Sequence, residues 1–447
     1  MRLELRRISV IGLGKLGAPL AACFASKGFP TVGCDIDPAK IRAINQGTSP
    51  IYEPGLQELI RESRGRLEAT QDYEKAVMSS QVSFITVSTP TDNAGGFSLE
   101  YVLQAAQQIG KAIHKKRDYH LVVLTSTVMP GSTEGQLKRM LESFAGKRCG
   151  HDFGLCYSPE FIALGSVIRD FLNPDFVLIG ESDPDSGEML SHLYKNVCEN
   201  NPAVARMNPV NAELTKLALN SFITTKITFA NMLARICERL PRADVDVVTS
   251  ALELDSRIGR KYLKGAIGYG GPCFPRDNLA LAFLARHIGS LATLAEATDA
   301  ANRQEARRLA ELVRSKLPKD GLVAILGLAY KANTDVVEES QGLLLAQLLL
   351  ADGISVRVYD PAAMKNAQKL LHHAAAFAGS MAECCQGADV IVIATPWDEF
   401  KEIPLSSLVR DGTRKVLVDC WRLLDRKNYE AAVEYFPLGI GIEEKLR

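Results

Sequence analysis

The chain has 447 residues, of which 47% are hydrophobic and 23% are charged, and this composition is typical of a globular protein. Its length exceeds what one hydrophobic core usually supports, so two or three domains are expected. The 52 basic residues balance 52 acidic residues, and this neutral total argues against nucleic acid and against an anionic membrane as partners.

Ten cysteines are scattered along the chain, with no CxxC pair and no spacing typical of a zinc site. This pattern favours reduced thiols in a reducing compartment, and no metal site is predicted. The first residues resemble a secretory signal, but Lys15 interrupts the apolar stretch. No apolar run reaches the roughly 18 residues of a membrane span, so a cytoplasmic protein is expected.

The first 35 residues predict a strand, a glycine-rich turn, a helix and a second strand. The β-branched run "RISVIGLG" is typical of a buried strand, "KLGAPLAACFASKG" is helical and closes at Gly28, and "PTVGCDID" follows as a strand. The runs "VSFITVST", "LVVLTSTV" and "DFVLIG" predict further buried strands with helical stretches between them. Strands that alternate with helices indicate an α/β fold with a parallel, doubly wound sheet.

Three glycines, Gly12, Gly14 and Gly17, form a GxGxxG motif between the first strand and its helix. In this position the motif is typical of a turn whose backbone approaches a pyrophosphate at a helix N-terminus. Asp35 ends the second strand, where a carboxylate accepts hydrogen bonds from ribose hydroxyls and repels a 2′-phosphate. A glycine turn of some other α/β protein is the alternative, but the strand, the helix and Asp35 favour NAD as the cofactor.

Two loops that follow predicted strands carry further candidate residues. The segment "TSTVMPGST" is a strand end that runs into a turn and presents hydroxyl groups at Ser126 and Thr127. The segment "YSPEFIALG" places Glu160 after a proline in a loop, where this residue could equally be an ordinary surface acid.

From Asn208 the composition changes to a stretch of about thirty residues without glycine, which predicts a long helix that connects domains or subunits. Lys216 and Asn220 are four residues apart and so share one face of this helix. Glu213 lies three residues before Lys216, and the spacing alone favours a solvated Glu–Lys pair over a catalytic role.

One cysteine, in "AIGYGGPCFPRDN", stands between a glycine-rich turn and a predicted helix start. Gly268, Gly270 and Gly271 precede Cys273 and predict backbone conformations that other residues rarely adopt. Pro275 fits the first position of a helix, so Cys273 would lie just before a helix N-terminus, where the partial positive charge favours a thiolate.

Two charged residues follow this cysteine. Arg276 adds positive charge near the thiol, whereas Asp277 opposes that effect and could orient water or a substrate hydroxyl. The alternative, a structural cysteine, fits four others in apolar strand or helix contexts: Cys23, Cys34, Cys156 and Cys237. The setting of Cys273 favours a nucleophile instead.

After Pro318 the alternation of strands and helices returns. The segment "GLVAILGLAYK" resembles the N-terminal strand and turn, and "ISVRVYDP", "ADVIVIAT" and "KVLVDC" predict more buried strands. The chain is therefore expected to contain two α/β units that flank a helical centre.

Eight motifs, in order, resemble those of the UDP-glucose/GDP-mannose dehydrogenases, the nucleotide-sugar 6-dehydrogenases. They are GLGKLG, the Asp35 strand, VSTP, STVMPG, SPEF, AELTKLALN, GYGGPCFPRD, and LGLAYKANTD followed by VYDP. The resemblance covers nearly the whole chain and implies two Rossmann-like doubly wound domains joined by a long central helix and a helical dimerisation region. The implied parts are an NAD-binding domain at 1–207, a central region with the cysteine loop at 208–305, and a nucleotide-sugar-binding domain at 306–447.

The reaction of that family oxidises the C6 alcohol of a nucleotide sugar to a carboxylate by two hydride transfers to NAD⁺. The resemblance therefore implies that Cys273 captures the intermediate aldehyde as a thiohemiacetal, which a second oxidation converts into a thioester that water hydrolyses. It implies UDP-glucose or a related UDP-hexose or hexosamine as substrate. It also implies at least a homodimer, because Arg257 matches an arginine that reaches the sugar site of the neighbouring subunit.

The resemblance assigns roles to individual residues. Lys216 and Asn220 would stabilise negative charge on the C6 oxygen, and Asp277 would handle protons or water. Glu160 and Thr127 would support the water that hydrolyses the thioester. The implied catalytic set is Cys273, Lys216, Asn220, Asp277, Glu160 and Thr127. The implied cofactor-binding residues are Gly12, Gly14, Lys15, Leu16, Gly17, Asp35, Lys40, Thr89, Pro90, Ser126, Thr127 and Arg276. The implied substrate-binding residues are Phe161, Lys216, Asn220, Arg257, Tyr262, Leu263, Lys264, Gly270 and Lys331.

Four positions depart from the family pattern. Leu164 stands where many relatives have a second glutamate, and Arg276 replaces a lysine. Glu338 stands where many relatives have an arginine that contacts the cofactor phosphates, and Trp421 stands where an arginine is common. Trp421 could stack on a base or could pack against the fold.

Two other functions stay open at this point. A two-electron hydroxyacid dehydrogenase of the 6-phosphogluconate type shares the NAD-binding domain and the helical centre, but it needs no thiol and has no second nucleotide-binding domain. A catalytically idle NAD-binding or scaffold protein would be expected to lack Cys273 or Lys216, and both are present.

Overall fold

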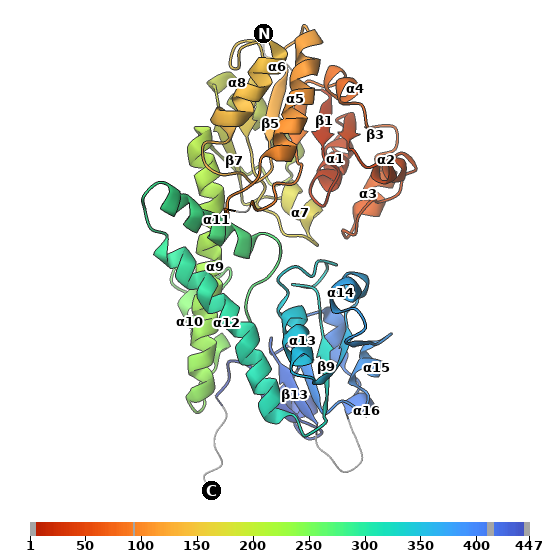
Figure 1. The fold of residues 1–447 in the computed structure, drawn as a ribbon, viewed down its shortest axis with the longest axis vertical. Coiled ribbons are helices and arrows are strands. Elements are labelled where there is room, and N and C mark those ends of the chain that lie inside the picture. Colours follow the sequence, from red (N-terminus) through yellow and green to blue (C-terminus); the bar gives the residue numbers. More distant parts are fainter. Residues whose placement is uncertain (1–5, 93, 409–414, 442–447) are drawn as a thin grey trace. The chain divides into compact units, whose positions relative to one another are not determined.

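The computed structural model describes residues 6–92, 94–408 and 415–441 (Figure 1). The chain forms two compact units, Met1–Ala218 and Leu219–Arg447, and the boundary between them falls inside one long helix. Within the described residues, no helix is long and apolar enough to cross a membrane. The finer division into three domains stays a prediction.

Eight strands form the sheet of the first unit, in the order β3-β2-β1-β4-β5-β6-β7-β8. Their bounds are β1 Ile8–Ile11, β2 Thr31–Cys34, β3 Leu67–Thr70, β4 Val82–Ile85, β5 Leu121–Leu124, β6 Gly154–Tyr157, β7 Phe176–Glu181 and β8 Ala203–Met207. Neighbouring strands from β3 to β6 are parallel, and their order is that of a doubly wound nucleotide-binding sheet. The predicted α/β fold is confirmed.

The sheet is not parallel throughout, and on this point the prediction is wrong. β7 pairs with β6 in the antiparallel direction, with Cys156 opposite Glu181, and β8 then runs parallel to β7. The connection from β6 to β7 contains one helix, α7, of only six residues. A parallel crossover usually needs a longer helix that carries the chain back to its starting edge, so the chain here returns in the opposite direction.

Helices cover both faces of this sheet. Their bounds are α1 Gly17–Ser26, α2 Pro38–Asn45, α3 Leu56–Glu62, α4 Tyr73–Met78, α5 Glu100–Lys115, the π-helix η1 Thr133–Leu137, α6 Lys138–Ala145, α7 Val167–Leu172 and α8 Pro184–Val197. Strand side chains alternate between two cores: Val10 packs with residues of α1, α3, α7 and α8, and Ile11 packs with residues of α4, α5 and α6. Burial on both faces explains why the strands read as continuous apolar runs.

The second unit contains a six-stranded sheet in the order β11-β10-β9-β12-β13-β14, with all neighbours parallel. Its strands are β9 Leu322–Leu326, β10 Ser355–Tyr359, β11 Ala376–Phe377, β12 Val390–Ile393, β13 Val416–Asp419 and β14 Glu434–Pro437. Its shorter helices are α13 Gln341–Ala351, α14 Met364–Leu371, α15 Met381–Cys385, the 3₁₀ helix η2 Asp398–Glu402, α16 Leu405–Leu408 and α17 Arg426–Tyr429. The second predicted α/β sheet is therefore confirmed.

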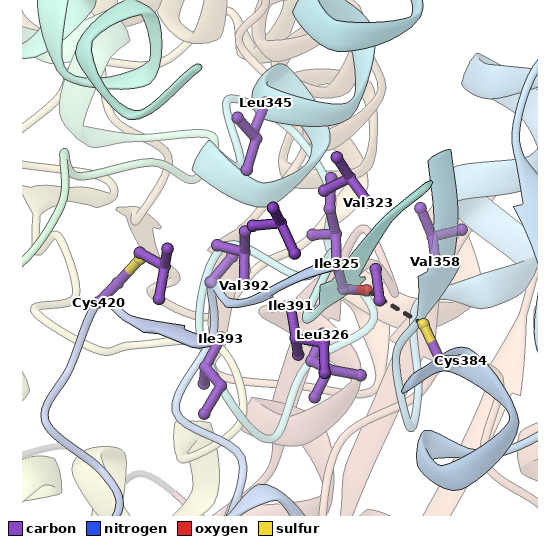
Figure 2. Packing of buried hydrophobic residues seen from close by; sticks show 14 of the residues in the cluster. Val323, Ile325, Leu326, Leu345, Val358, Cys384, Ile391, Val392, Ile393 and Cys420 are labelled. Atoms are coloured by element: carbon purple, nitrogen blue, oxygen red, sulfur yellow. Dashed lines mark hydrogen bonds between the residues drawn. The ribbon is translucent and has the colours of Figure 1, made fainter. Parts of the chain in front are cut away.

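Aliphatic side chains, four aromatic side chains and three cysteines fill the core of this sheet. Figure 2 shows side chains of this buried cluster, among them Ile325, Leu345 and Ile391. Cys384 donates a hydrogen bond of 3.8 Å to the carbonyl oxygen of Ile325. Trp421 packs against the same core, and its indole N–H donates to the carbonyl oxygen of Ala394 at 2.9 Å. Of the two interpretations left open for Trp421, the structure supports packing against the fold.

Helices make up the central part of the chain, and α9 and α12 are the longest of them: α9 Pro209–Arg239, α10 Val245–Glu253, α11 Phe274–His287 and α12 Thr293–Lys316. The predicted long helix is confirmed and begins at the proline that follows Asn208. Proline is well suited to the first turn of a helix, because its missing N–H would have no partner there.

Two buried asparagines of the second unit hold the segment that precedes Cys273. Asn231 of α9 accepts from the backbone N–H of Ala266 at 2.8 Å and donates to the carbonyl of Ile267 at 2.9 Å. Asn302 of α12 accepts from the N–H of Tyr269 at 2.8 Å and donates to the carbonyl of the same residue at 2.9 Å. Each amide thus satisfies a buried donor and a buried acceptor of an irregular segment.

We expect Asn302→Ala to lower the free energy of unfolding by about 1–3 kcal/mol, because it leaves the buried N–H of Tyr269 unpaired. The carbonyl of Tyr269 keeps only the longer bond, 3.4 Å, from the side chain of Gln341. Equilibrium denaturation measures this change. The matched control is Asn196→Ala on the surface of α8, where the amide bonds, among the described residues, only to the carbonyl of His192. The control should change stability by less than about 0.5 kcal/mol. Equal losses for both variants would contradict the clamping role of Asn302.

Candidate active site

The turn between β1 and α1 has the geometry that the glycine motif predicts. Gly12 has a φ of +98°, and a Cβ at Gly17 would overlap the carbonyl oxygen of Gly12. A Cβ at Gly14 would meet no atom within 4 Å, so the structure leaves open space beside this backbone. This arrangement fits a pyrophosphate placed against the turn and the first N–H groups of α1.

Asp35, at the end of β2, is fixed beside this turn. Its carboxylate accepts from the N–H of Leu13 at 2.6 Å and from the N–H of Asp37 at 2.8 Å, and Lys40 forms an ion pair with it at 3.1 Å. The predicted residues Asp35 and Lys40 are therefore brought together at the carboxyl end of the sheet. A carboxylate fixed here suits ribose hydroxyls and disfavours a 2′-phosphate, so the residues present fit NAD.

The loops after β4 and β5 meet at the same end of the sheet. The hydroxyl of Thr89 donates to the carbonyl of Thr127 at 2.7 Å, and the hydroxyl of Ser126 donates to the carbonyl of Val87 at 2.6 Å. Thr86 joins them to the glycine turn by donating to Gly12 at 2.7 Å. The predicted Thr89, Ser126 and Thr127 thus lie together where ligands bind in doubly wound sheets.

Glu160 follows β6 and lies in a partly buried polar environment. Its carboxylate accepts from the hydroxyl of Tyr194 at 3.1 Å, and its backbone carbonyl accepts from Lys216 Nζ at 2.7 Å. The ammonium of Lys216 also lies 4.7 Å from the ring centroid of Phe161. Burial raises the pKa of Glu160 to about 7, against the opposing effects of Tyr194 and Lys216. A carboxylate of this kind can act as a base near neutral pH.

The predicted solvated pair between Glu213 and Lys216 is wrong. Glu213 is fully buried and accepts from the N–H of Gly131 at 2.6 Å and from both the N–H and the hydroxyl of Thr133, at 2.8 Å and 2.6 Å. Its carboxylate therefore holds the "MPGST" loop that follows Ser126 and Thr127. Burial removes this carboxylate from water and raises the pKa of Glu213, against the opposing effect of the hydrogen bonds from Thr133 and Gly131. No local pattern in the sequence indicates this contact, since its partners lie about eighty residues away.

In the second unit, Asn220 of α9 meets the first turn of α11. Its amide donates to Asp277 Oδ2 at 2.6 Å, and both side chains are buried. Arg276 forms an ion pair with the other carboxylate oxygen of Asp277 at 3.2 Å. The structure therefore joins three of the predicted residues in one hydrogen-bonded group.

Cys273 lies at the N-cap position of α11 and is exposed, whereas the other nine cysteines are buried or partly buried, all ten lying within the described residues. Pro275 was predicted to be the first residue of this helix, but it is the second, because the helix begins at Phe274. The expectation of unusual backbone angles at three glycines holds only for Gly271, which has a φ of +87°. Gly270 is needed for space instead, because a Cβ there would overlap the carbonyl oxygen of Glu339.

The remaining predicted residues of the second unit lie apart from this group in sequence. Arg257 is exposed and forms an ion pair with Asp255 at 2.6 Å. Tyr262 is half exposed with a φ of +66°, Leu263 is buried, and Lys264 is exposed. Lys331 is partly buried in the segment after β9. Three predicted cofactor-binding residues of the first unit remain. Lys15 and Leu16 lie in the glycine-rich motif and are exposed and partly buried, respectively, and Pro90 is exposed in the loop after β4.

Three family models match the chain in order. They are the NAD binding domain of the UDP-glucose/GDP-mannose dehydrogenase family at residues 6–198, its central domain at residues 210–304, and its UDP binding domain at residues 324–426. The match of the third model does not favour a hydroxyacid dehydrogenase of the 6-phosphogluconate type.

Individual relatives agree with these models over the whole chain. The UDP-glucose 6-dehydrogenase AglM of Haloferax volcanii is 36% identical over 434 residues, which cover 95% of this chain and 100% of the relative. The UDP-glucose 6-dehydrogenase TuaD of Bacillus subtilis is 34% identical over 96% of this chain and 92% of its own length. The solved structure of a UDP-glucose dehydrogenase from Pyrobaculum islandicum matches with a TM-score of 0.88 at 34% identity, covering 99% of both chains. The protein therefore belongs to the UDP-glucose/GDP-mannose dehydrogenase family and is an NAD-dependent nucleotide-sugar dehydrogenase.

Proposed function

We propose that this enzyme oxidises the C6 alcohol of UDP-glucose, or of a related UDP-hexose or hexosamine, to the carboxylate of the uronic acid. A UDP binding domain model matches residues 324–426, and two relatives that match nearly the whole chain are UDP-glucose 6-dehydrogenases. The glycine turn and Asp35 would hold NAD⁺, which would supply the hydride acceptor for both oxidations.

The placement of Cys273 is the observation that carries this proposal. It is an exposed thiol at the N-cap position of a fourteen-residue helix, which stabilises negative charge as the sulfur attacks. The thiol adds to the aldehyde left by the first oxidation and gives a thiohemiacetal, and loss of a second hydride gives a thioester. Water then cleaves the carbon–sulfur bond, releasing the carboxylate and restoring the thiol.

The other predicted catalytic residues divide the remaining tasks. Lys216 and Asn220, four residues apart in α9, donate hydrogen bonds to the C6 oxygen as it becomes negative. Asp277 holds the amide of Asn220 and exchanges protons with water or with the alcohol. Glu160, with Thr127, takes a proton from the water that attacks the thioester. The raised pKa of Glu160, about 7, suits a base that must also exist as a neutral acid.

We propose a homodimer in which Arg257 serves the sugar site of the partner subunit. Three exposed side chains of α9, Phe222, Phe229 and Ile236, follow one another at intervals of seven residues and so form one apolar stripe along the helix. An exposed stripe of this kind is typical of a subunit interface. Arg257 is exposed, paired only to nearby Asp255 in the part of the chain that the structure describes, and could exchange that partner for a phosphate or sugar of another subunit.

We also place the enzyme in the cytoplasm. All ten cysteines lie in described residues and none forms a disulfide. This pattern favours a reducing compartment.

The proposed chemistry predicts about two NADH for each UDP-glucose consumed in excess NAD⁺. Cys273→Ala should remove the second oxidation and the formation of the uronic acid, because no sulfur is left to hold the aldehyde. The partly buried Cys149 provides the control, and Cys149→Ala should keep the full ratio. Parallel assays with UDP-N-acetylhexosamines and GDP-mannose identify the preferred sugar. A ratio of about one in the wild type would return Cys273 to a structural role.

The role of Glu160 predicts a pH dependence. Its carboxylate is the active form, so hydrolysis of the thioester should rise with pH, reach half its maximum near pH 7 and level off above that value. Glu160→Gln should slow hydrolysis by roughly 10²–10⁴-fold and remove this limb. Intact-mass measurement should then detect the sugar thioester on Cys273. If the limb persists in Glu160→Gln, another group is the base.

The shared site predicts complementation between two inactive variants. Arg257→Ala and Cys273→Ala should each be inactive alone, but a co-expressed mixture should recover about a quarter of the wild-type rate, since half of the dimers are mixed and each has one complete site. Light scattering on the same samples establishes that they are dimers. Dimers without recovered activity would show that Arg257 serves its own subunit.

A further inference from the structure

A chain of three hydrogen-bonded contacts ends at the carboxylate of Glu160 in the first unit. The carbonyl oxygen of Leu178 in β7 accepts from the hydroxyl of Ser158 at 3.0 Å. The oxygen of Ser158 lies 3.0 Å from the hydroxyl oxygen of Tyr194, and either group can donate there. Tyr194 in turn lies 3.1 Å from Glu160 Oε1.

Both hydroxyl groups are held in place by the surrounding core. Ser158 is 1% exposed, and its backbone N–H donates to the carbonyl of Leu124 at the end of β5 at 2.8 Å. Tyr194 is 2% exposed, and its ring packs edge-on against Phe171 of α7 with centroids 6.3 Å apart. The oxygens therefore keep their spacing, and only the hydroxyl hydrogens can rotate.

The chain has three oxygen–oxygen contacts, and each contact needs one hydrogen. When Glu160 is ionised, Ser158 and Tyr194 supply only two hydrogens, so one contact is left without a donor. When Glu160 is protonated, its own hydrogen completes the chain: Glu160 donates to Tyr194, Tyr194 to Ser158, and Ser158 to Leu178. The hydrogen count therefore favours the neutral acid, and ionisation reverses the direction of the bond between Tyr194 and Glu160.

We propose that Ser158 and Tyr194 are positioning residues that form a two-hydroxyl relay, which stores the proton on Glu160 and turns the hydroxyl of Tyr194 toward the carboxylate when that proton leaves. This inference deepens the function proposed above and rests on the role of Glu160 in hydrolysis. Neither Ser158 nor Tyr194 needs to touch substrate for this purpose.

Other groups also face Glu160, and they must be separated from the relay. Lys216 of α9 favours the carboxylate, whereas burial opposes it. The thiols of Cys23 in α1 and of Cys198 after α8 also interact electrostatically with Glu160. Substitution of a single hydroxyl group in the relay leaves all three of these groups in place.

The relay predicts opposite effects for its two hydroxyl groups. Tyr194→Phe removes the donor to the carboxylate, and because hydrogen bonds to a charged group are the stronger ones, the ionised form loses more than the neutral form. Ser158→Ala removes the acceptor that Tyr194 needs when Glu160 is neutral, but it leaves the bond from Tyr194 to the carboxylate intact. Ionisation of Glu160 should therefore become harder in the first variant and easier in the second.

Infrared titration of the full-length protein, without substrate, tests this directly. The carbonyl band of protonated Glu160 appears in the difference between the wild type and Glu160→Gln, and its loss with rising pH gives the midpoint of ionisation. We expect the midpoint to rise by about one pH unit in Tyr194→Phe and to fall by a comparable amount in Ser158→Ala. Tyr119→Phe is the matched control, because Tyr119 forms a similar hydroxyl pair with Ser186 at 3.0 Å that does not include Glu160. The control should leave the midpoint unchanged.

Midpoints that stay fixed, or that move in the same direction in both variants, would overturn the relay. Decay of the thioester on Cys273, formed from UDP-glucose and followed by quenched intact-mass measurement, provides the second readout. Its pH limb should move with the infrared midpoint in each variant. If the infrared midpoints shift as expected but the decay has no limb there, the relay controls Glu160 and the proposed hydrolytic role of Glu160 fails.

Discussion

The cost of removing polar side chains from water governs the arrangement of this active site. One long helix, α9, carries Glu213, Lys216 and Asn220 at intervals of three and four residues, and all three are buried. A buried charge or amide without partners is strongly unfavourable, so each side chain requires a specific segment of the same unit to lie against it. Glu213 requires the N–H groups of residues 131 and 133, Lys216 requires the carbonyl of residue 160, and Asn220 requires Asp277. Within each unit, the polar side chains of α9 therefore determine where the segments packed against them lie.

The same desolvation produces the chemistry. A glutamate exposed to water would be fully ionised at neutral pH and a weak base. Burial of Glu160 raises its pKa to about 7, and the hydrogen bond from Tyr194 and the charge of Lys216 offset only part of that effect. Glu213 has the same side chain and is also buried, but it accepts three hydrogen bonds from the backbone and side chain of one loop. Burial raises the pKa of both carboxylates, but the three donors to Glu213 all belong to the segment that it anchors.

The parts of this molecule that the sequence predicts well are those encoded by neighbouring residues. The strand–turn–helix around Gly12 and Gly17, the long helix after Asn208 and the helix that begins beside Cys273 follow from local composition and spacing. The reversal of β7 and the burial of Glu213 depend on residues distant in the sequence, so helical spacing led to the wrong prediction of a solvated pair. The glycines before Cys273 are an intermediate case: the need for glycine is visible in the sequence, but only the structure shows that Gly270 is required for space rather than for a positive φ.

The backbone of Gly270 and Gly271 lies close to the backbone of residues 338 and 339, and this contact explains how the cysteine loop tolerates Glu338, which departs from the family pattern. The N–H of Gly271 donates to the carbonyl oxygen of Glu338 at 2.9 Å, while a Cβ at Gly270 would overlap the carbonyl oxygen of Glu339. Both contacts use the backbone at 338 and 339, and the side chain of Glu338 is exposed. A substitution at position 338 leaves the backbone carbonyl that accepts from Gly271 in place, whatever the charge of the new side chain. The effect of Glu338 is therefore confined to ligands that approach its exposed carboxylate, and the placement of Cys273 does not depend on it.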